Sequence, residues 1–476
     1  MMPANMHPPA ARDQIKTQKR ALLLLALVFI VHIVVALVTW KVSGPSVFFK
    51  ADTGHYLEPA QALLHGSFST AGSPELFRTP GYPLLLVPAV ASAHVVMVAL
   101  LENSLLAAFT AWLVWRVTAH LFPGAKAAWW AVLLYSVEPL GFLYSETIMS
   151  DTAFTAVLLL FVWLFLRFLD SPSYGRLALS AFALAGAAYV RPASTYLAFL
   201  LSALLLIFPR ALSPRRRLAR AVVFPVVFQL LLLPWVVRNA LVADYAGFSS
   251  SGNWNLYFQS GAAIQAKLEH RSFAETHLAF GANNNEVYFQ QHPEQRAWTQ
   301  GRVVRAWGRE GRKIVWAHWA TYLPIHAKGM AIVTFEPGTT ELLKLFRLYP
   351  ETGGLLVRVH DQGFTQATLW LLRQYPVTIV VLPLLAAQMV LYYVLALVGL
   401  RRLPAAVKVT FIIMIVYFTV VSGMPAAVAR YRVPFMPLLC VCAGGAIAQW
   451  RGTKAKAKDA GGNSACGSLG RASSSM

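Results

Sequence analysis

Long apolar runs separated by short polar segments dominate the pattern of this chain of 476 residues. The first run, from Ala21 to Trp40, is about twenty residues long, which is enough for a helix to cross a bilayer. Further runs predict spans at 94–119, 127–144, 150–168, 177–190, 194–209, 220–240, 376–400, 405–422 and 432–449. The pattern predicts an all-α integral membrane protein with about 10–12 transmembrane helices.

The spans suggest a division of the chain into parts. We expect a cytoplasmic tail at 1–20, an N-terminal transmembrane module at 21–240 with its first outer loop at 41–94, and an outer polar region at 241–375. C-terminal transmembrane helices at 376–450 and a disordered cytoplasmic tail at 451–476 follow. Within the outer region, an apolar patch near 314–334 fits either an extra span or a helix lying on the surface. The stretch at 255–261, NLYFQSG, is similar to an engineered cleavage tag, but its flanks look native and we keep it.

Composition and charge sharpen this picture. A hydrophobic fraction of 57% with 13% charged residues excludes an ordinary soluble domain. The net charge of +21 does not indicate nucleic-acid binding, because the basic residues are scattered between apolar runs. They gather instead in alternate connections, among them Lys19, Arg20, Lys126, the cluster at 215–217 and Arg401, which the positive-inside rule assigns to the cytoplasm. The N-terminus is therefore expected inside, and the loop at 41–94 outside.

The first outer loop contains a predicted interfacial helix and a rigid turn. Asp52 or Thr53 can cap the helix, and Gly66 would end it. Its apolar face would consist of Tyr56, Ala60, Leu63 and Leu64. The turn Arg-Thr-Pro-Gly-Tyr-Pro at 78–83 follows, and the short apolar stretch at 82–93 is expected to be interfacial or re-entrant.

Arginines recur at the outer ends of the spans, where positive-inside statistics would not place them. They are Arg78, Arg191, Arg238, Arg430 and Arg432, with Tyr82 and Tyr431 beside them in the same motifs. Such arginines can reach lipid headgroups, pair with acids, or hold an anionic ligand. Because guanidinium binds phosphate through two parallel hydrogen bonds, several at one depth would suit a lipid phosphate or pyrophosphate.

The outer carboxylates admit a catalytic and a structural interpretation. Asp52 could be a general base that takes a proton from a hydroxyl, and Glu146 or Asp151 could be a second acid. Alternatively, each could be a helix cap or an ion-pair partner. His55 follows Asp52 closely enough to share its helix face, so a divalent metal is possible, although two such residues are few ligands. Cys440, Cys442 and Cys466 lack the spacing of a metal site.

The order of these motifs resembles the GT-C superfamily of bacterial membrane glycosyltransferases. The residues are Asp52 and Tyr56, then Arg78-Thr-Pro-Gly-Tyr-Pro, Arg191-Pro, Pro-Trp-x-x-Arg238-Asn, and Arg430-Tyr-Arg-x-Pro-x-x-Pro, spread over about residues 20–450. The branch that looks most similar is related to protein O-mannosyltransferases and to the aminoarabinose transferase of lipid A. The resemblance implies an inverting transfer of sugar from a polyprenyl-phosphate donor, with Asp52 in the place of the base. Thr53 departs from the Asp-Glu pair of the eukaryotic mannosyltransferases.

The sequence thus predicts an enzyme of the bacterial inner membrane with both termini cytoplasmic and its active site outside. Its expected partners are a polyprenyl-phosphate-linked sugar, the bilayer and a glycan, lipid or protein acceptor, and no nucleic acid. The alternative is a transporter or flippase for a lipid-linked anion, although the acids and arginines gather on one side and not at the midplane. A non-enzymatic role in envelope assembly also stays open.

Overall fold

The computed structural model describes residues 11–282, 284–350, 358 and 363–450, and this part of the chain is almost wholly helical. The tail at 451–476, Cys466 and residues 1–10 lie outside the described residues. The predicted all-α membrane fold is confirmed. In the described part, the strands form one short antiparallel pair, β1 (Ser69–Thr70) and β2 (Ser73–Pro74).

The first half of the chain forms the helices α1 (Ala11–Ser43), η1 (Pro45–Phe48), α2 (Gly54–Leu64), α3 (Gly81–Leu85), α4 (Val87–Ala91), α5 (Val95–Leu121), α6 (Ala125–Ser136), α7 (Pro139–Ser145), α8 (Asp151–Asp170), α9 (Tyr174–Val190), η2 (Pro192–Ser194), α10 (Leu197–Leu205) and α11 (Pro214–Ala243). The second half forms α12 (Ser251–Trp254), η3 (Asn255–Gly261), α13 (Ala262–Leu268), α14 (Phe273–Ala279), α15 (Asn285–Gln291), η4 (Pro293–Ala297), α16 (Gln300–Ala317), α17 (Trp319–Phe335), α18 (Thr339–Leu345), α20 (Phe364–Gln374), α21 (Val377–Leu400), α22 (Ala405–Ser422) and η5 (Ala429–Phe435). Beyond η5 the chain stays helical to Trp450.

Seven helices of the described chain are long and apolar enough to cross a membrane: α1, α5, α8, α11, α21, α22 and the stretch Ala429–Trp450. The other predicted spans correspond to shorter helices. α9 and α10 are apolar but short, and the span expected at 127–144 is divided into α6 and α7. The break falls at Glu138, whose carboxylate accepts a hydrogen bond from the backbone of Gly141 at the start of α7. At the N-terminus, α1 begins at Ala11, ten residues earlier than the expected span.

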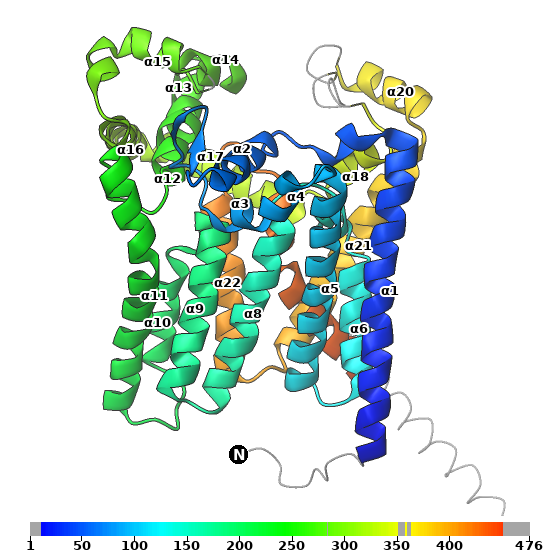
Figure 1. The fold of residues 1–476 in the computed structure, drawn as a ribbon. Coiled ribbons are helices and arrows are strands. Elements are labelled where there is room, and N and C mark those ends of the chain that lie inside the picture. The colour runs from blue at the N-terminus through cyan, green and yellow to red at the C-terminus, as the bar shows by residue number, and fades with distance from the viewer. Residues whose placement is uncertain (1–10, 283, 351–357, 359–362, 451–476) are drawn as a thin grey trace, which may run out of the picture.

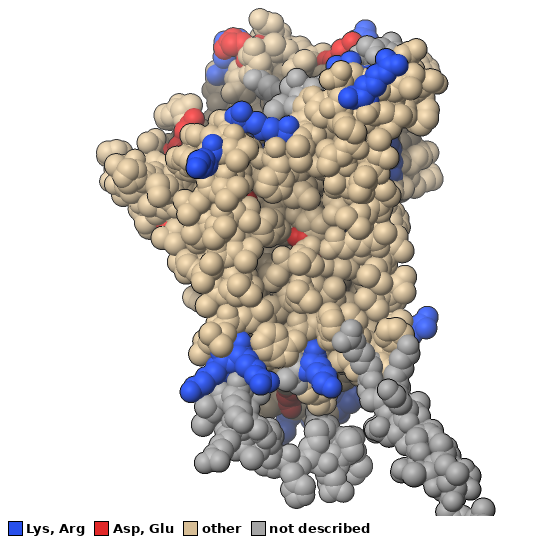
Figure 2. Space-filling view, turned by 90° about the vertical axis from the view of Figure 1, so that its right-hand side faces the viewer, with Lys and Arg blue, Asp and Glu red and all other residues tan. Residues whose placement is uncertain are grey.

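The long helices form an upright bundle, and most shorter elements lie at one end of it (Figure 1). The end at the bottom of Figure 1, called here the basic end, holds the tight connections α5–α6, α8–α9, α10–α11 and α21–α22. Figure 2 shows Lys and Arg at that end, a wide belt almost free of charge, and mixed charges at the other end. The opposite end, called here the site end, carries the loop with α2 and the region 241–375.

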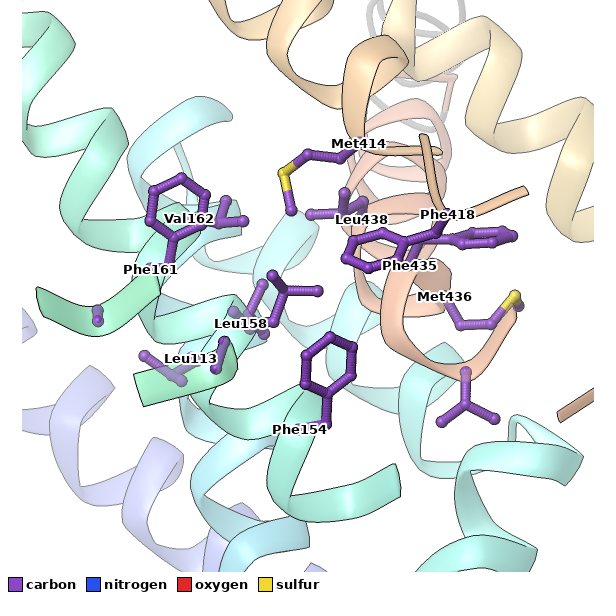
Figure 3. Packing of buried hydrophobic residues seen from close by; sticks show 14 of the residues in the cluster. Leu113, Phe154, Leu158, Phe161, Val162, Met414, Phe418, Phe435, Met436 and Leu438 are labelled. Atoms are coloured by element: carbon purple, nitrogen blue, oxygen red, sulfur yellow. The ribbon is translucent and has the colours of Figure 1, made fainter. Parts of the chain in front are cut away.

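The core lies between α5, α8, α22 and the last helix. Phe154, Phe161, Phe418 and Phe435 are among its largest fully buried side chains, and they interdigitate with Leu and Met residues (Figure 3). Phe154 meets Phe418 edge to face with ring centroids 5.8 Å apart. This packing joins the N-terminal helices to the C-terminal ones, so residues distant in sequence share one rigid body.

The first loop contains the short helices that its pattern predicts. Tyr56 and Ala60 are buried on one face of α2, but Leu64 is 45% exposed and does not join that face. Thr53 precedes the helix without capping it through its side chain. Gly81 packs so closely on α9 that a Cβ there would lie 2.7 Å from the carbonyl group of Tyr189, which ties the Arg-Thr-Pro-Gly turn to the end of α9.

Within the region 241–375, α12–α16 form a helical lobe over one side of the site end, and α18 and α20 lie at the opposite side (Figure 1). The stretch Asn255–Gly261 is a π-helix that buries Tyr257 and Phe258, so the tag-like sequence is part of the folded core. The apolar patch near 314–334 corresponds to α17, which contacts η5 and α22 and is absent from the seven candidate spans of the described chain. In Figure 1, α17 lies at the level of α2, as expected for a helix on the membrane surface.

Candidate active site

Asp52 lies in the turn that leads into α2, and neighbouring residues fix this turn to the loop before α8. The hydroxyl of Thr53 donates to the carbonyl of Ile148 at 2.9 Å. The Tyr56 hydroxyl lies 2.9 Å from that of Ser150. These two hydrogen bonds to residues 148–150 position the turn that carries the Asp52 carboxylate.

Two arginines form hydrogen bonds with the Asp52 carboxylate. Arg78 Nη2 donates to Oδ1 of Asp52 at 2.7 Å, and Arg430 Nη2 donates to Oδ2 at 3.0 Å. Burial alone would raise the pKa of Asp52, but the charges of Arg78 and Arg430 outweigh burial and hold that pKa at about 2. Asp52 is thus a carboxylate at neutral pH, and its two oxygens are both engaged.

A second carboxylate extends this network. Asp151, at the start of α8, is completely buried and accepts a hydrogen bond of 2.6 Å from Arg191. Arg430 Nε lies 3.7 Å from the same Asp151 oxygen, so Arg430 bridges the two acids. The group comprises three arginines and two carboxylates, which leaves one net positive charge (3 − 2 = +1). Such a group is suited to an additional anion.

The network borders a cavity of about 1330 Å³. Asp52, Arg78, Arg191, Arg430 and Tyr431 line it. Phe154 and Phe418, which belong to the core in Figure 3, also line it, so one part of the cavity is apolar and continues from the bundle. Its size is sufficient for a sugar with a phosphate and part of a lipid chain.

The cavity also has walls that the motif analysis did not identify. Tyr245, Trp254, Asn255 and Gln259 come from the outer region, and the α17 residues Tyr322 and His326 also line the cavity. A signal existed in the concentration of aromatic and amide residues at 254–259, within a region that is otherwise polar. Hydropathy alone gave no reason to place this segment beside Asp52.

Arg238 and Arg432 lie apart from this network. Arg238 donates to the carbonyls of Glu75 and Phe68 and stacks over the ring of Trp235, so it fastens the β-hairpin loop to α11. Arg432 is only 2% exposed and donates to the carbonyl of Glu336. Neither arginine lines the cavity.

Two other predicted residues are also placed elsewhere. Glu146 is buried and lies 2.7 Å from Nδ1 of His32, so it ties the loop before α8 to α1. Tyr82 is 1% exposed and packs edge to face on Tyr56. Of the two proposed second acids, Asp151 therefore joins Asp52 through Arg430, whereas Glu146 does not.

His55 lines the cavity close to Asp52. The described residues contain no group of three or more His, Cys, Asp or Glu side chains arranged to hold a metal ion. Cys440 and Cys442 are free and buried. The polar groups that line the cavity include carboxylates, guanidinium groups, histidine rings, amides and hydroxyls.

Residues 82–237 match the family described as dolichyl-phosphate-mannose-protein mannosyltransferase, over about one third of the chain. No curated protein sequence matches the chain. The matched segment includes Asp151 and Arg191, whereas Asp52, Arg78 and Arg430 lie outside it. The match confirms the resemblance noted from the motifs and indicates a glycosyltransferase.

Proposed function

Because residues 82–237 carry the pattern of the dolichyl-phosphate-mannose-protein mannosyltransferase family, we propose that this chain is an inverting membrane glycosyltransferase. It would move a sugar from a polyprenyl-phosphate donor to an acceptor hydroxyl. The observation that carries the proposal is the Asp52 carboxylate held between Arg78 and Arg430 on the wall of the large cavity.

The donor phosphate would bind to Arg430 and Arg191. Each guanidinium has five N–H donors, and the contacts to Asp52 and Asp151 leave several of them unused. The negative charge of the phosphate would neutralise the net positive charge of the network. The apolar walls formed by Phe154 and Phe418 would contact the first part of the lipid chain.

Asp52 would act as the general base. A carboxylate with a pKa of about 2 is a weak base. The ion pairs between Asp52 and the arginines therefore need to weaken before Asp52 accepts a proton. A phosphate that draws Arg430 toward itself would raise the pKa of Asp52. Binding of the donor would in this way prepare the base for the acceptor.

The bond changes balance without another reactant. The acceptor oxygen attacks the anomeric carbon as its proton passes to Asp52, and the bond between that carbon and the phosphate oxygen breaks. The electron pair leaves on the lipid phosphate, whose charge Arg430 and Arg191 stabilise. Attack opposite to the leaving group inverts the anomeric centre.

The reaction would take place on the outer face of a bacterial inner membrane. The basic end of the bundle, with Lys126, Arg176 and Arg401 in its connections, suits the cytoplasm, and the site end then faces outward. Under this arrangement both termini are cytoplasmic. The transmembrane module at 21–240, the outer region at 241–375 and the helices at 376–450 would contribute jointly to one site.

The test is transfer by the purified protein in nanodiscs. Polyprenyl-phosphate sugars are supplied with candidate acceptors, and product is measured by mass spectrometry. Asp52→Asn is expected to lower turnover by about 100- to 10,000-fold, the usual contribution of a general base. Asp170→Asn is the matched control, because Asp170 pairs with His120 at the basic end and is expected to leave turnover unchanged.

Near-normal turnover by Asp52→Asn would exclude the base role. Failure of the wild-type protein to consume any polyprenyl-phosphate sugar would overturn the proposed function. Transfer in a nanodisc solution, which has no sealed compartment, would exclude a protein that only transports its substrate.

A further inference from the structure

We infer that the acceptor is a neutral carbohydrate, bound on the wall formed by residues 245–259 and presenting a sugar hydroxyl to Asp52. This inference rests on the proposed glycosyl transfer and specifies its second substrate. The residues that carry it are Tyr245, Trp254, Asn255 and Gln259, which line the cavity and are named here the amide–aromatic wall.

A continuous series of contacts joins this wall to Asp52. Arg78 binds Asp52 at 2.7 Å, and its guanidinium carbon lies 4.8 Å from the centroid of the Phe77 ring. Phe77 in turn meets Trp254 edge to face at 5.6 Å. Trp254 and Asp52 thus line the same cavity with Phe77 and Arg78 between them, so an oligosaccharide seated on Trp254 would extend past these two side chains to present a hydroxyl to the base.

Aromatic rings and primary amides are a combination that suits a sugar. A pyranose ring has apolar C–H faces that pack on indole and phenol rings, and the large area of Trp makes this burial favourable. Its hydroxyls both donate and accept hydrogen bonds, as do the amides of Asn255 and Gln259. Gln259 Oε1 has no hydrogen-bond partner, a cost that a donating hydroxyl would remove.

A phosphorylated acceptor fits this wall less well. The arginines among the cavity-lining residues are Arg78, Arg191 and Arg430, and all three belong to the network assigned to the base and the donor. The amide–aromatic wall brings no Lys or Arg to the cavity. A second phosphate would therefore have to compete with the donor for the same guanidinium groups.

A peptide acceptor would also lack its usual mode of docking. Extended peptides commonly add as a strand to an exposed sheet edge. Trp254, Asn255 and Gln259 of the wall lie instead in α12 and the π-helix η3, whose backbone groups bond within the helix, and Tyr245 lies in the loop before them. Recognition here would depend on side chains.

The wall is also built rigidly. Gly308 and Gly311 of α16 allow such close packing that a Cβ at these positions would lie 2.4 Å from Asn253 Oδ1 and 2.6 Å from the carbonyl carbon of Leu256. π-Helical turns occur frequently at functional sites, where they redirect side chains. A preformed wall loses little entropy when it binds a ligand.

The test is binding of defined probes to the full-length protein in nanodiscs, followed by saturation-transfer NMR. The probes are neutral hexose oligosaccharides, the same oligosaccharides bearing a phosphate, and a Ser/Thr-rich peptide. Trp254→Ala is expected to weaken binding of the neutral oligosaccharide by about tenfold, as for the loss of one buried aromatic anchor. Trp254→Phe is expected to restore part of the affinity.

Trp316→Ala is the matched control, since Trp316 is 83% exposed and does not line the cavity, and it is expected to bind like wild type. Asn255 makes no side-chain hydrogen bond within the described residues, so Asn255→Leu is expected to leave folding unaffected. It is expected to weaken binding, because it removes an amide that would bond the sugar. Equal oligosaccharide binding by wild type, Trp254→Ala and Asn255→Leu would overturn the inference. Preferential binding and glycosylation of the phosphorylated probe or the peptide would overturn it too.

These outcomes are separable from failure of the proposed function. Consumption of the donor, and its loss in Asp52→Asn, tests glycosyl transfer whichever acceptor is used. A wild-type protein that consumes donor but glycosylates only the peptide would keep the proposed function and reject the carbohydrate acceptor. One that binds oligosaccharide through Trp254 but consumes no donor would reject the transfer reaction.

Discussion

Arg430 and Arg432 are two residues apart in one motif, yet they lie in two charged regions of opposite character. Arg430 joins Asp52 and Asp151 on the wall of the 1330 Å³ cavity. Arg432 lines a small pocket together with Glu138 and donates to the carbonyl of Glu336, and these three residues are called here the buried seam. Arg430 keeps 13% of its side chain exposed, whereas Arg432 is 2% exposed.

The buried seam and the cavity wall differ in which groups bind the charged side chains. In the buried seam, Glu138 accepts from the backbone of Gly141, and Glu336 lies 3.3 Å from the backbone nitrogen of Ala429. Acids and arginine there are used to join α7, the end of α17 and η5. On the cavity wall, three arginines face two acids, and positive charge remains for a ligand. An arginine near the membrane boundary is thus informative about function only once its partners are known.

Replacing Arg430 and Arg432 in turn is the most direct test of this difference, and it has the largest expected effect. Arg430→Gln is expected to lower kcat/KM by about 100- to 1000-fold, as for loss of one preorganised charge-stabilising donor, with the folded protein retained. Arg432→Gln is expected to lower the free energy of unfolding by about 1–3 kcal/mol, because it removes the buried donor that bonds the carbonyl of Glu336. Turnover per folded molecule and thermal unfolding in detergent measure the two effects. If Arg432→Gln lost turnover and kept stability, the assignment of the two regions would be reversed.

A smaller effect is expected at the two arginines of the N-terminal module. Arg191→Gln should raise the KM for the lipid donor by about tenfold, since a charge-assisted hydrogen bond contributes about 1.5–3 kcal/mol. Arg238→Gln is the matched control, because its guanidinium is engaged by the carbonyls of Glu75 and Phe68. Donor titration at fixed acceptor measures both. An unchanged KM in Arg191→Gln would assign Arg191 a structural role like that of Arg238.

The smallest expected effect is the pH dependence of stability. The pKa of Asp52 is lowered from its ordinary value of 3.8 to about 2, so its stabilising contribution is complete above 3.8 and is lost as pH falls toward 2. Melting temperatures measured from pH 5 down to pH 2 should therefore fall more steeply for wild type than for Asp52→Asn. Parallel curves would mean that the two arginines do not hold Asp52 in the folded protein.

Much of the fold follows from hydropathy, because a bilayer forces apolar runs into helices whatever their neighbours are. Hydropathy left open whether the patch near 314–334, which is α17, would be an extra span or a surface helix. The positions of the long apolar helices came from this constraint. The division of the span at 127–144 did not, since it depends on the buried carboxylate of Glu138 and its bond to Gly141. The early start of α1 at Ala11 likewise lies in polar sequence that has no hydropathy signal.

The candidate site was predictable in part. The family motifs pointed to Asp52, Arg78, Arg191 and Arg430, which the structure brings together, although their roles stay predictions. The motifs could not distinguish Arg432 and Glu146 from the residues of the network, because a single position along a helix changes which way a long side chain points. The position of the amide–aromatic wall beside Asp52 could not be predicted, because the sequence pattern of the outer region does not show how this region packs on the bundle.

The bridge formed by Arg430 also bears on how the protein is made. Arg430 lies 378 residues after its partner Asp52, at the start of the helical stretch Ala429–Trp450. Until that helix inserts, the nascent chain has the acid but lacks the cation that spans both acids. A chain that stops before Arg430 should therefore be unable to consume donor lipid, because its two acids would lack the cation that joins them.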